Sequence, residues 1–259
     1  MRIGIAYDTK EDYSFEGNVN YFDFTTLAEL TYVKQTLEKC GHTVHLLGNY
    51  QNILKHYVDT QLKDIDLVFN MSEGMKSRNR EGAVPSLLEM VNIPYVGSDA
   101  YALSLCLNKY HSKIIAQYLN ILTPEYFIVN TTNDIKEKNP SSYPCVLKPI
   151  YEGTSSGIKL VQSYDEYVLK ADLLLGIFKQ PILCEKYIDG REFTVSLIGT
   201  GTDTAAVGII ETVRKNGRPV CIFSSKDKME GNCKRRFALI ITDNLKEIGY
   251  YEGFKFHFF

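Results

Sequence analysis

The feature that most constrains the fold is a strand–helix–strand pattern at the start of the chain. Residues 2–7, RIGIAY, are short and apolar, as a buried strand is. Residues 25–40 place apolar side chains at helical spacing, Gly41 ends that helix, and residues 42–47 form a second apolar segment. This spacing predicts a βαβ unit, with parallel strands joined by a right-handed crossover.

The same alternation continues to residue 97. A third strand is expected over residues 65–70, a helix over residues 81–92 and a further strand over residues 93–97. Alternating strands and helices of this kind build a parallel sheet with helices packed on it. We therefore predict that the chain begins with a three-layer α/β domain.

The pattern changes after residue 97. Residues 99–120 predict two helices that are separated near Leu107–Asn108, and residues 123–129 predict a strand. Residues 130–142 are polar and predict a loop or a short exposed helix. Further strands are expected over residues 144–149, 157–161, 181–187, 191–199 and 205–213, with a helix over residues 164–178.

Composition excludes several classes of protein. The chain has 259 residues, which is enough for two or three lobes, and its 44% hydrophobic and 23% charged residues are ordinary for a soluble globular protein. The net charge of −2 gives no basic excess for nucleic acid or for an anionic membrane surface. No apolar run approaches the roughly 20 residues of a membrane helix. We therefore expect neither a nucleic-acid partner nor a membrane partner.

The cysteines and the N-terminal segment indicate a cellular location. The six cysteines are scattered and include no CxxC pair, which favours reduced thiols over a disulfide framework or a zinc site. The first ten residues enter an apolar strand at once and do not follow the pattern of a signal peptide. Both observations predict a cytoplasmic protein.

A lysine followed by a glycine-rich loop is the sharpest chemical signal. In CVLKPIYEGTSSGIKLV, Lys148 ends an expected strand, and the loop contains Gly153, Thr154, Ser155 and Gly157. Glycines let backbone N–H groups approach an anion, hydroxyl groups donate further hydrogen bonds, and the lysine adds a positive charge. These features together suit a polyphosphate. The alternative is a β-hairpin with a polar loop and a surface lysine.

Two glutamates flank a tight turn in the next segment, PILCEKYIDGREFTVSLIG. Glu185 precedes the IDG turn and Glu192 follows it. Such a turn can expose backbone groups to an adenine edge, and a carboxylate beyond it can accept the hydroxyls of a ribose. The alternative for each glutamate is a solvated carboxylate on an edge strand. Both lie amid apolar strands, however, where an unpaired charge is costly.

The two segments VLKPIYEGTSSGI and LCEKYIDGREFTV resemble the nucleotide-binding core of the D-alanine–D-alanine ligases, a family of the ATP-grasp superfamily. The upstream segment from VFNMSEG to NKYHSK is similar to the same family, and the resemblance runs from residue 1 to about residue 230. It implies a Rossmann-like pre-ATP-grasp domain over residues 1–97, a central ATP-grasp lobe over residues 98–180 and an incomplete C-terminal ATP-grasp lobe over residues 181–259.

The resemblance also implies roles for single residues. Lys109 and Lys148 correspond to lysines that reach the phosphates of ATP, and Lys228 to a further phosphate lysine that is favoured over Lys226. The loop that closes over the phosphates corresponds to Glu152, Gly153, Thr154, Ser155 and Gly157, of which Thr154 and Ser155 are catalytic candidates together with Lys228. The adenine hinge corresponds to Glu185, Lys186 and Ile188, and the ribose carboxylate to Glu192. For Lys109 and Lys228 the alternative is an ordinary surface lysine.

A polar loop after the third expected strand is the candidate for substrate binding. Ligands bind at the carboxyl end of such strands in open α/β sheets, and Glu73, Arg78 and Arg80 lie there. Arginine matches the geometry of a substrate carboxylate. The alternative is a surface loop with internal salt bridges.

Two departures from the family pattern affect substrate and metal. The segment AYDTKEDYSFEG stands where the family has a glycine-rich turn with a substrate-binding glutamate. The family also binds magnesium through an acidic residue on one strand and a Glu-x-Asn pair on the next, and no segment after Lys228 fits. We therefore expect magnesium as a family cofactor, assign no metal ligand, and expect a truncated or shifted C-terminal end.

The resemblance implies an ATP-dependent carboxylate–amine ligase that forms an acyl phosphate and joins amino acids, D-alanine among them, for peptidoglycan precursor synthesis. ATP is the implied cofactor, and a homodimer is a possible assembly. Two alternatives stay open. The chain could be an inactive or nucleotide-binding-only remnant of an ATP-grasp protein, or an ATP-grasp ligase for another substrate.

Overall fold

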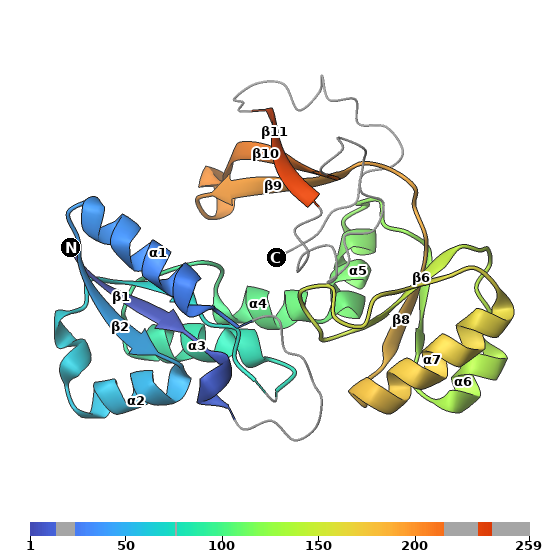
Figure 1. The fold of residues 1–259 in the computed structure, drawn as a ribbon, viewed down its shortest axis with the longest axis horizontal. Coiled ribbons are helices and arrows are strands. Elements are labelled where there is room, and N and C mark those ends of the chain that lie inside the picture. Colours follow the sequence, from blue (N-terminus) through green and yellow to red (C-terminus); the bar gives the residue numbers. More distant parts are fainter. Residues whose placement is uncertain (14–23, 76, 215–232, 240–259) are drawn as a thin grey trace. The chain divides into compact units, whose positions relative to one another are not determined.

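The computed structural model describes residues 1–13, 24–75, 77–214 and 233–239, and of residues 214 and 233–239 it describes the backbone alone. The chain divides into two compact units, Met1–Ser112 and Lys113–Phe258. Figure 1 shows the helices and strands of both units along the chain.

The first unit is built on a parallel sheet. Its strands are β1 (Arg2–Tyr7), β2 (Thr43–Gly48), β3 (Leu67–Met71) and β4 (Tyr95–Val96), in the order β2-β1-β3-β4. All pairings are parallel, and Ile5 lies opposite both Leu46 and Phe69. The central strand β1 is buried along most of its length, as its apolar sequence predicts. The expected parallel sheet is confirmed.

Helices cover both faces of this sheet. Figure 1 shows α1 (Leu27–Lys39) on one face, and α2 (Tyr50–Val58) and α3 (Ala83–Met90) on the other. Ile53 of α2 and Leu88 of α3 are fully buried in one hydrophobic core with Val68 of β3. Short 3-10 helices lie at Lys10–Asp12, Gln61–Asp64 and Arg80–Gly82. The helix α2 was not predicted from the sequence.

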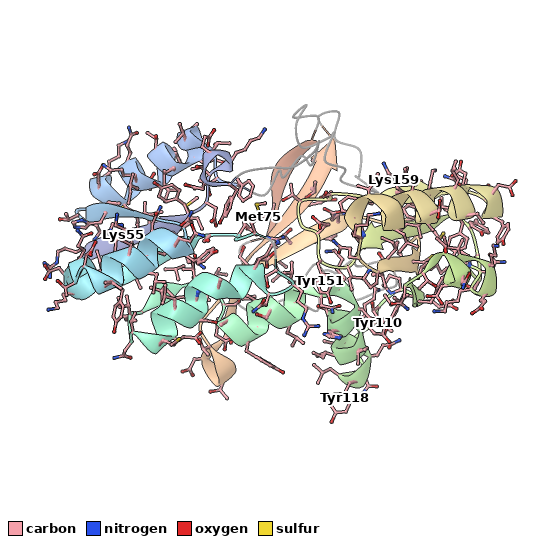
Figure 2. All side chains as sticks on the ribbon, turned by 90° about the horizontal axis from the view of Figure 1, so that it is seen from below. Lys55, Met75, Tyr110, Tyr118, Tyr151 and Lys159 are labelled. Atoms are coloured by element: carbon pink, nitrogen blue, oxygen red, sulfur yellow. The ribbon has the colours of Figure 1, made fainter. Side chains whose placement is uncertain are left out.

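The predicted break between two helices is confirmed at Asn108. Helix α4 (Ala100–Leu107) ends before this residue and α5 (Lys109–Tyr118) begins after it. The Asn108 side-chain oxygen accepts hydrogen bonds from the backbone N–H groups of Tyr110, at 3.0 Å, and His111, at 3.1 Å. This side chain therefore caps the new helix, which is a favoured role of asparagine. Figure 2 shows Tyr118 projecting outward at the far end of α5.

The second unit contains an antiparallel sheet with helices packed against it. The strands are β5 (Tyr126–Val129), β6 (Cys145–Pro149), β7 (Lys159–Val161) and β8 (Ile182–Lys186), in the order β5-β8-β6-β7. Helices α6 (Thr132–Glu137) and α7 (Tyr164–Phe178) accompany them. Because β8 belongs to this sheet, the sheet continues past residue 180. The limits of the three predicted lobes stay a prediction.

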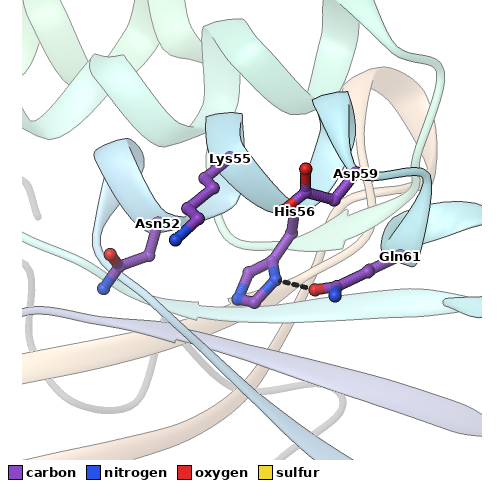
Figure 3. Close-up of a pocket in the computed structure, with 5 residues that line it drawn as sticks. All are labelled: Asn52, Lys55, His56, Asp59 and Gln61. Atoms are coloured by element: carbon purple, nitrogen blue, oxygen red, sulfur yellow. Dashed lines mark hydrogen bonds between the residues drawn. The ribbon is translucent and has the colours of Figure 1, made fainter.

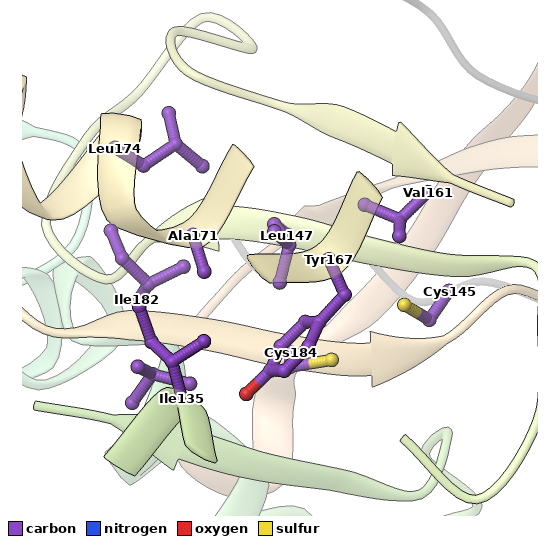
Figure 4. Packing of buried hydrophobic residues seen from close by; sticks show 10 residues of the cluster. Ile135, Cys145, Leu147, Val161, Tyr167, Ala171, Leu174, Ile182 and Cys184 are labelled. Carbon is purple, nitrogen blue, oxygen red and sulfur yellow. The ribbon is translucent and has the colours of Figure 1, made fainter. Parts of the chain in front are cut away.

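Figure 4 shows the core between this sheet and its helices. Leu147, Ile182 and Leu174 are buried there beside Tyr167, whose ring is fully buried. The Tyr167 hydroxyl donates a hydrogen bond to the Lys138 carbonyl at 2.8 Å, so the polar end of the ring is satisfied. Each such aliphatic side chain stabilises the fold by about 1.5–3 kcal/mol. This core holds the strands from which the candidate site is built.

A second antiparallel sheet follows in the same unit. Its strands are β9 (Glu192–Ile198), β10 (Ala205–Arg214) and β11 (Cys233–Leu239), in the order β11-β10-β9, with a 3-10 helix at Gly201–Asp203. The strand β11 was not predicted. The aromatic segment over residues 250–259 lies outside the described residues. Among the described helices, none is both long and apolar enough to cross a bilayer.

Candidate functional site

The side chains of Lys148 and Glu185 meet on neighbouring strands. In the register of β6 and β8, Val146 lies opposite Glu185 and Lys148 lies opposite Leu183. Lys148 and Glu185 are therefore diagonal neighbours on one face, within reach of long side chains. The Lys148 ammonium forms an ion pair with one carboxylate oxygen of Glu185. The structure thus brings together a predicted phosphate lysine and a predicted hinge residue.

A second lysine, Lys113 of α5, occupies the other side of the same carboxylate. Its Nζ lies 2.9 Å from Glu185 Oε2 and donates a hydrogen bond to Thr123 Oγ1 at 2.7 Å. It also lies 4.9 Å from the centre of the Tyr126 ring. Lys113 is only 9% exposed. Sequence reasoning missed this residue, because nothing in NKYHSK distinguishes a buried lysine from a surface one.

Burial and charge act in opposite directions on this cluster. Burial raises the pKa of Glu185, but the ammonium groups of Lys148 and Lys113 outweigh that effect and lower its pKa to about 2. Burial lowers the pKa of Lys113, and the charge of Glu185 offsets part of that shift. Two ammonium groups share one carboxylate, so the cluster carries one positive charge in excess. A site of this charge attracts anions.

The predicted phosphate loop adopts an uncommon backbone. Thr154 has φ 44° and Ser155 has φ 62°, so two successive residues with side chains lie in the left-handed region. This region costs a non-glycine residue roughly 1–3 kcal/mol. The Ser156 N–H donates to the Gly153 carbonyl at 2.8 Å, which closes a tight turn. The loop is therefore held in a shape that the surrounding structure must maintain.

Gly157 ends this loop at a position that only glycine fits. Its φ is 72°, and a Cβ atom there would lie 2.7 Å from Pro149 Cγ and 2.8 Å from two ring carbons of Phe178. Both the backbone angle and the close neighbours exclude a side chain. The glycine predicted to approach the phosphates thus also packs the loop against the end of α7.

Gln180 holds the other end of the loop. Its side-chain oxygen accepts a hydrogen bond from the Tyr151 N–H at 2.7 Å, and its side-chain nitrogen donates to Glu152 Oε1 at 2.7 Å. One amide group therefore fixes the first residues of the loop. This role was missed, because a single glutamine before a strand carries no periodic signal.

The hinge segment connects the two sheets of this unit. The backbone N–H of Lys186 donates to the Glu125 carbonyl at 2.8 Å, while its side chain is exposed. Ile188 is half-buried, and Glu192 opens β9 with 9% exposure, opposite Thr212 of β10. Glu192, the predicted ribose carboxylate, is therefore buried, whereas the alternative interpretation expects a solvated carboxylate.

Lys109 and Lys228 are the two other lysines predicted to bind phosphate. Lys109 is the first residue of α5 and is half-buried, next to the cap at Asn108. It belongs to the first unit, whereas Lys148 and Glu192 belong to the second, and its approach to them stays a prediction. Lys228 lies outside the described residues.

The arginines of the predicted substrate loop differ in their surroundings. Arg80 donates to the Glu73 carbonyl at 2.8 Å and lies 3.5 Å from the Glu73 carboxylate and 3.3 Å from that of Glu81. Arg78 is exposed. These contacts of Arg80 are salt bridges within the loop, as the alternative interpretation expects. The role of Glu73, Arg78 and Arg80 toward a substrate stays a prediction.

Asp8 anchors the substrate loop at the end of β1. The side chain is fully buried, and its Oδ2 accepts hydrogen bonds from the N–H groups of Glu73, at 2.9 Å, and Gly74, at 3.0 Å. The hydroxyl groups of Ser72 and Tyr13 donate to the same carboxylate. An ionised carboxylate that accepts such bonds is well satisfied when buried. Sequence reasoning did not identify this residue.

A small open pocket lies on the first unit. The residues that line it are distant in sequence from the predicted site residues. Figure 3 shows Asn52, Lys55 and His56 of α2 around it, together with Asp59 and Gln61, which follow this helix. The Gln61 oxygen is hydrogen-bonded to the His56 ring. None of the predicted site residues lines this pocket, so we assign it no role in the candidate site.

No magnesium site is assigned. Within residues 1–13, 24–75, 77–214 and 233–239, no group of three or more His, Cys, Asp or Glu side chains is placed to hold a metal ion.

The antiparallel sheet that carries Lys148, the loop that Gly157 closes and the strand that Glu192 begins belong to a fold of the ATP-grasp class. The family described as "D-ala D-ala ligase C-terminus" matches residues 114–246. The chain thus belongs to the D-alanine–D-alanine ligase family.

Similar proteins agree with this assignment. A protein named D-alanine–D-alanine ligase from Thermotoga petrophila is 33% identical over 183 residues, which are 69% of this chain and 56% of the relative. The chain thus spans about half the length of the curated relatives that it matches.

Solved structures share the fold. The crystal structure of D-alanine–D-alanine ligase from Bacillus anthracis matches 95% of this chain and 74% of its own, with a TM-score of 0.61 and 21% identity. The structure of that ligase complexed with ATP matches with a TM-score of 0.60 and 20% identity, over 95% of this chain and 74% of its own.

Proposed function

We propose that this chain binds ATP and acts as an ATP-dependent carboxylate–amine ligase. The observation that carries the proposal is the cluster of Lys148, Lys113 and Glu185 at the end of β6, which has one positive charge in excess beside the loop of Gly153–Gly157. A polyphosphate is the kind of ligand that such a charge and such a loop suit. The ligase names of the relatives support the same reading.

The reaction that we propose has two steps. One substrate carboxylate oxygen attacks the γ-phosphorus of ATP, the bond from γ-phosphorus to the bridging oxygen breaks, and ADP leaves with an acyl phosphate formed. The amine of the second substrate then attacks the acyl carbon, loses a proton and displaces phosphate, which gives an amide. In such chemistry the protein acts mainly by positioning groups and stabilising charge.

Each part of the site has a proposed task. Lys148, together with Lys109 and Lys228, neutralises phosphate charge, and the loop that contains Thr154 and Ser155 excludes water from the acyl phosphate. Glu185, Lys186 and Ile188 form the adenine hinge through the backbone, and Glu192 accepts the ribose hydroxyls. Glu73, Arg78 and Arg80 hold a substrate carboxylate.

D-alanine is the proposed substrate, with peptidoglycan precursor synthesis as the proposed role. Relatives that carry the name D-alanine–D-alanine ligase support this substrate. The segment AYDTKEDYSFEG favours the second candidate, an ATP-grasp ligase for another small-molecule substrate, because it replaces the expected substrate turn. A nucleotide-binding protein without turnover is the third possibility.

Magnesium, a homodimer and a cytoplasmic location complete the proposal. Magnesium would neutralise phosphate charge when bound. Among the described cysteines, Cys40, Cys106, Cys145 and Cys184 are free thiols, which supports a reducing compartment. Size-exclusion chromatography with light scattering tests the homodimer, and fractionation of cells tests the location.

The experiment is a titration with ATP, followed by an assay of phosphate release with magnesium and D-alanine. Lys148→Met should weaken ATP binding more than tenfold, whereas Lys159→Met, at an exposed site on the neighbouring strand β7, should not. Phosphate release that depends on D-alanine supports the ligase. Release with another amino acid favours the second candidate, and binding without turnover favours the third. A failure to bind ATP contradicts the proposal.

A further inference from the structure

The Glu185 carboxylate is shared by two lysines that approach it from different elements. One oxygen pairs with Lys148 of β6, and the other lies 2.9 Å from Lys113 of α5. The side chains of Glu185 and Lys113 are each 11% exposed. The two lysines therefore do not compete for one oxygen, and either can leave while the other stays.

The contacts of the Lys113 ammonium indicate that it holds another side chain in place and does not bind a ligand. An ammonium group has three N–H donors. Three acceptors surround this one, namely Glu185 Oε2 at 2.9 Å, Thr123 Oγ1 at 2.7 Å and the Pro124 carbonyl at 3.4 Å. The Tyr126 ring lies against the same ammonium. With its donors used within the protein, Lys113 has none left for a phosphate.

We propose that Lys113 is a positioning residue that holds the Glu185 carboxylate, so that Lys148 can leave that carboxylate and bind a phosphate of ATP. This inference rests on the proposed nucleotide-binding function and assigns to it a residue outside the set predicted from the sequence. The ligand is the polyphosphate of a nucleotide.

The physical reason is the cost of a buried charge without a partner. If Lys148 turned toward a phosphate in a protein without Lys113, the buried Glu185 carboxylate would lose its remaining counter-charge. Leaving such a charge unpaired is strongly unfavourable. With Lys113 in place, the carboxylate keeps a partner throughout. The cost of releasing Lys148 is thereby reduced, and the affinity for the nucleotide rises.

The net charge of the cluster adds an expectation for the single Lys113 variant compared with the double variant. The cluster of Lys113, Lys148 and Glu185 has a net charge of one positive unit. Removal of the Lys113 charge leaves a neutral pair, which attracts an anion less. Removal of both the Lys113 charge and the Glu185 charge restores one positive unit on Lys148. The double variant should therefore recover affinity that the single variant loses.

The test is a double-mutant cycle on ATP affinity, measured by calorimetry on the full chain with magnesium. Lys113→Met should weaken ATP binding about tenfold. In the Glu185→Gln background, the same substitution should change affinity less than about threefold, because the neutral amide needs no counter-charge. Lys170→Met is the matched control, since Lys170 is another partly buried lysine whose 2.6 Å ion pair with Glu166 lies on α7. It should leave ATP affinity unchanged.

A second, more conservative variant keeps the inference testable if Lys113→Met does not fold. Thr123→Val removes one hydrogen bond that holds the Lys113 ammonium and should weaken ATP binding about twofold to threefold. Circular dichroism and thermal unfolding show whether each variant is folded.

The outcomes separate the inference from the proposed function. ATP binding by the natural chain with equal affinity in folded Lys113→Met overturns the inference alone. An equal loss in the natural and the Glu185→Gln backgrounds would mean that Lys113 acts through its own charge or through the fold and not by holding Glu185, and it also overturns the inference. If the natural chain does not bind ATP, the proposed function and the inference fall together.

Discussion

The guanidinium of Arg191 binds the carboxylate of Glu211 through two hydrogen bonds, from Nε at 2.7 Å and from Nη2 at 3.1 Å. Arg191 lies in the turn before β9, and Glu211 is a buried residue of β10. The guanidinium also lies 4.7 Å from the centre of the Phe193 ring. This pair ties the end of the hinge turn to the neighbouring strand, just before Glu192.

Replacing Arg191 by methionine should lower the free energy of unfolding by about 1–2 kcal/mol, because a buried carboxylate loses a bidentate partner. The solvent exposure of Arg191, 53% of the side chain, limits the effect. Arg2→Met is the control, since Arg2 pairs with Asp64 on an exposed surface and should cost less than about 1 kcal/mol. Equal losses in a denaturant titration would contradict this account.

Gly157→Ala should destabilise the chain and weaken ATP binding. The left-handed backbone and the contacts with Pro149 and Phe178 leave no room for a methyl group. We expect a loss of about 1–3 kcal/mol in the free energy of unfolding. Gly176→Ala is the matched control, because Gly176 lies inside α7 with open space at its Cβ position, and alanine should stabilise that helix by about 0.5–1 kcal/mol. Thermal unfolding of both variants tests the difference, and a loss in both would refute the packing argument.

The stability of the chain should depend on pH through Glu185. Its folded pKa of about 2 lies below the unfolded value, so its ionisation stabilises the fold above the unfolded pKa. That contribution, on the order of 3 kcal/mol, is lost as the pH falls from about 5 to about 2. Urea titrations at several pH values should show a shallower pH dependence in Glu185→Gln than in the natural chain. Parallel curves would show that Glu185 is not held by its lysines.

Asp8→Asn should loosen the loop that contains Glu73 and Gly74. Asparagine keeps a single side-chain oxygen, so either the backbone N–H groups that bond to Oδ2 or the Tyr13 hydroxyl that bonds to Oδ1 loses its acceptor. The remaining hydrogen bonds to the loop also lose the assistance of the negative charge. We expect a loss of about 1–3 kcal/mol, with faster amide hydrogen exchange in the loop. Asp66→Asn, at an exposed acceptor of the Arg2 N–H, should cost less than about 1 kcal/mol. Unchanged exchange at Glu73 and Gly74 would count against the anchor.

The sequence predicts the fold correctly where buried residues recur at the regular spacing of a strand or a helix. The parallel sheet follows from short apolar strands such as β1, and the break at Asn108 follows from a residue that caps helices. Helix α2 escaped prediction because only Ile53 is buried in it, while the apolar Leu54, Tyr57 and Val58 are exposed. Its one clear signal is the cap at Asn49, whose side chain accepts from two backbone N–H groups.

The candidate site could be predicted only in part, for a related reason. Lys148 and Glu185 stand out because they interrupt apolar strands, and the structure brings their side chains together. No interrupted apolar strand marks Lys113, Gln180 or Asp8. Each of these residues acquires its role from partners that are distant in sequence. Tertiary pairing of this kind leaves no trace in local periodicity.

The position of β9 at the edge of its sheet has a practical consequence. In the described sheet this strand pairs only with β10, and its Leu197 and Ile198 are 62% and 65% exposed. A one-sided strand with uncovered apolar side chains is a template for pairing with another chain. Solutions of this protein should therefore be handled dilute, and oligomers that form on concentration should be tested for strand exchange before they are interpreted as a native assembly.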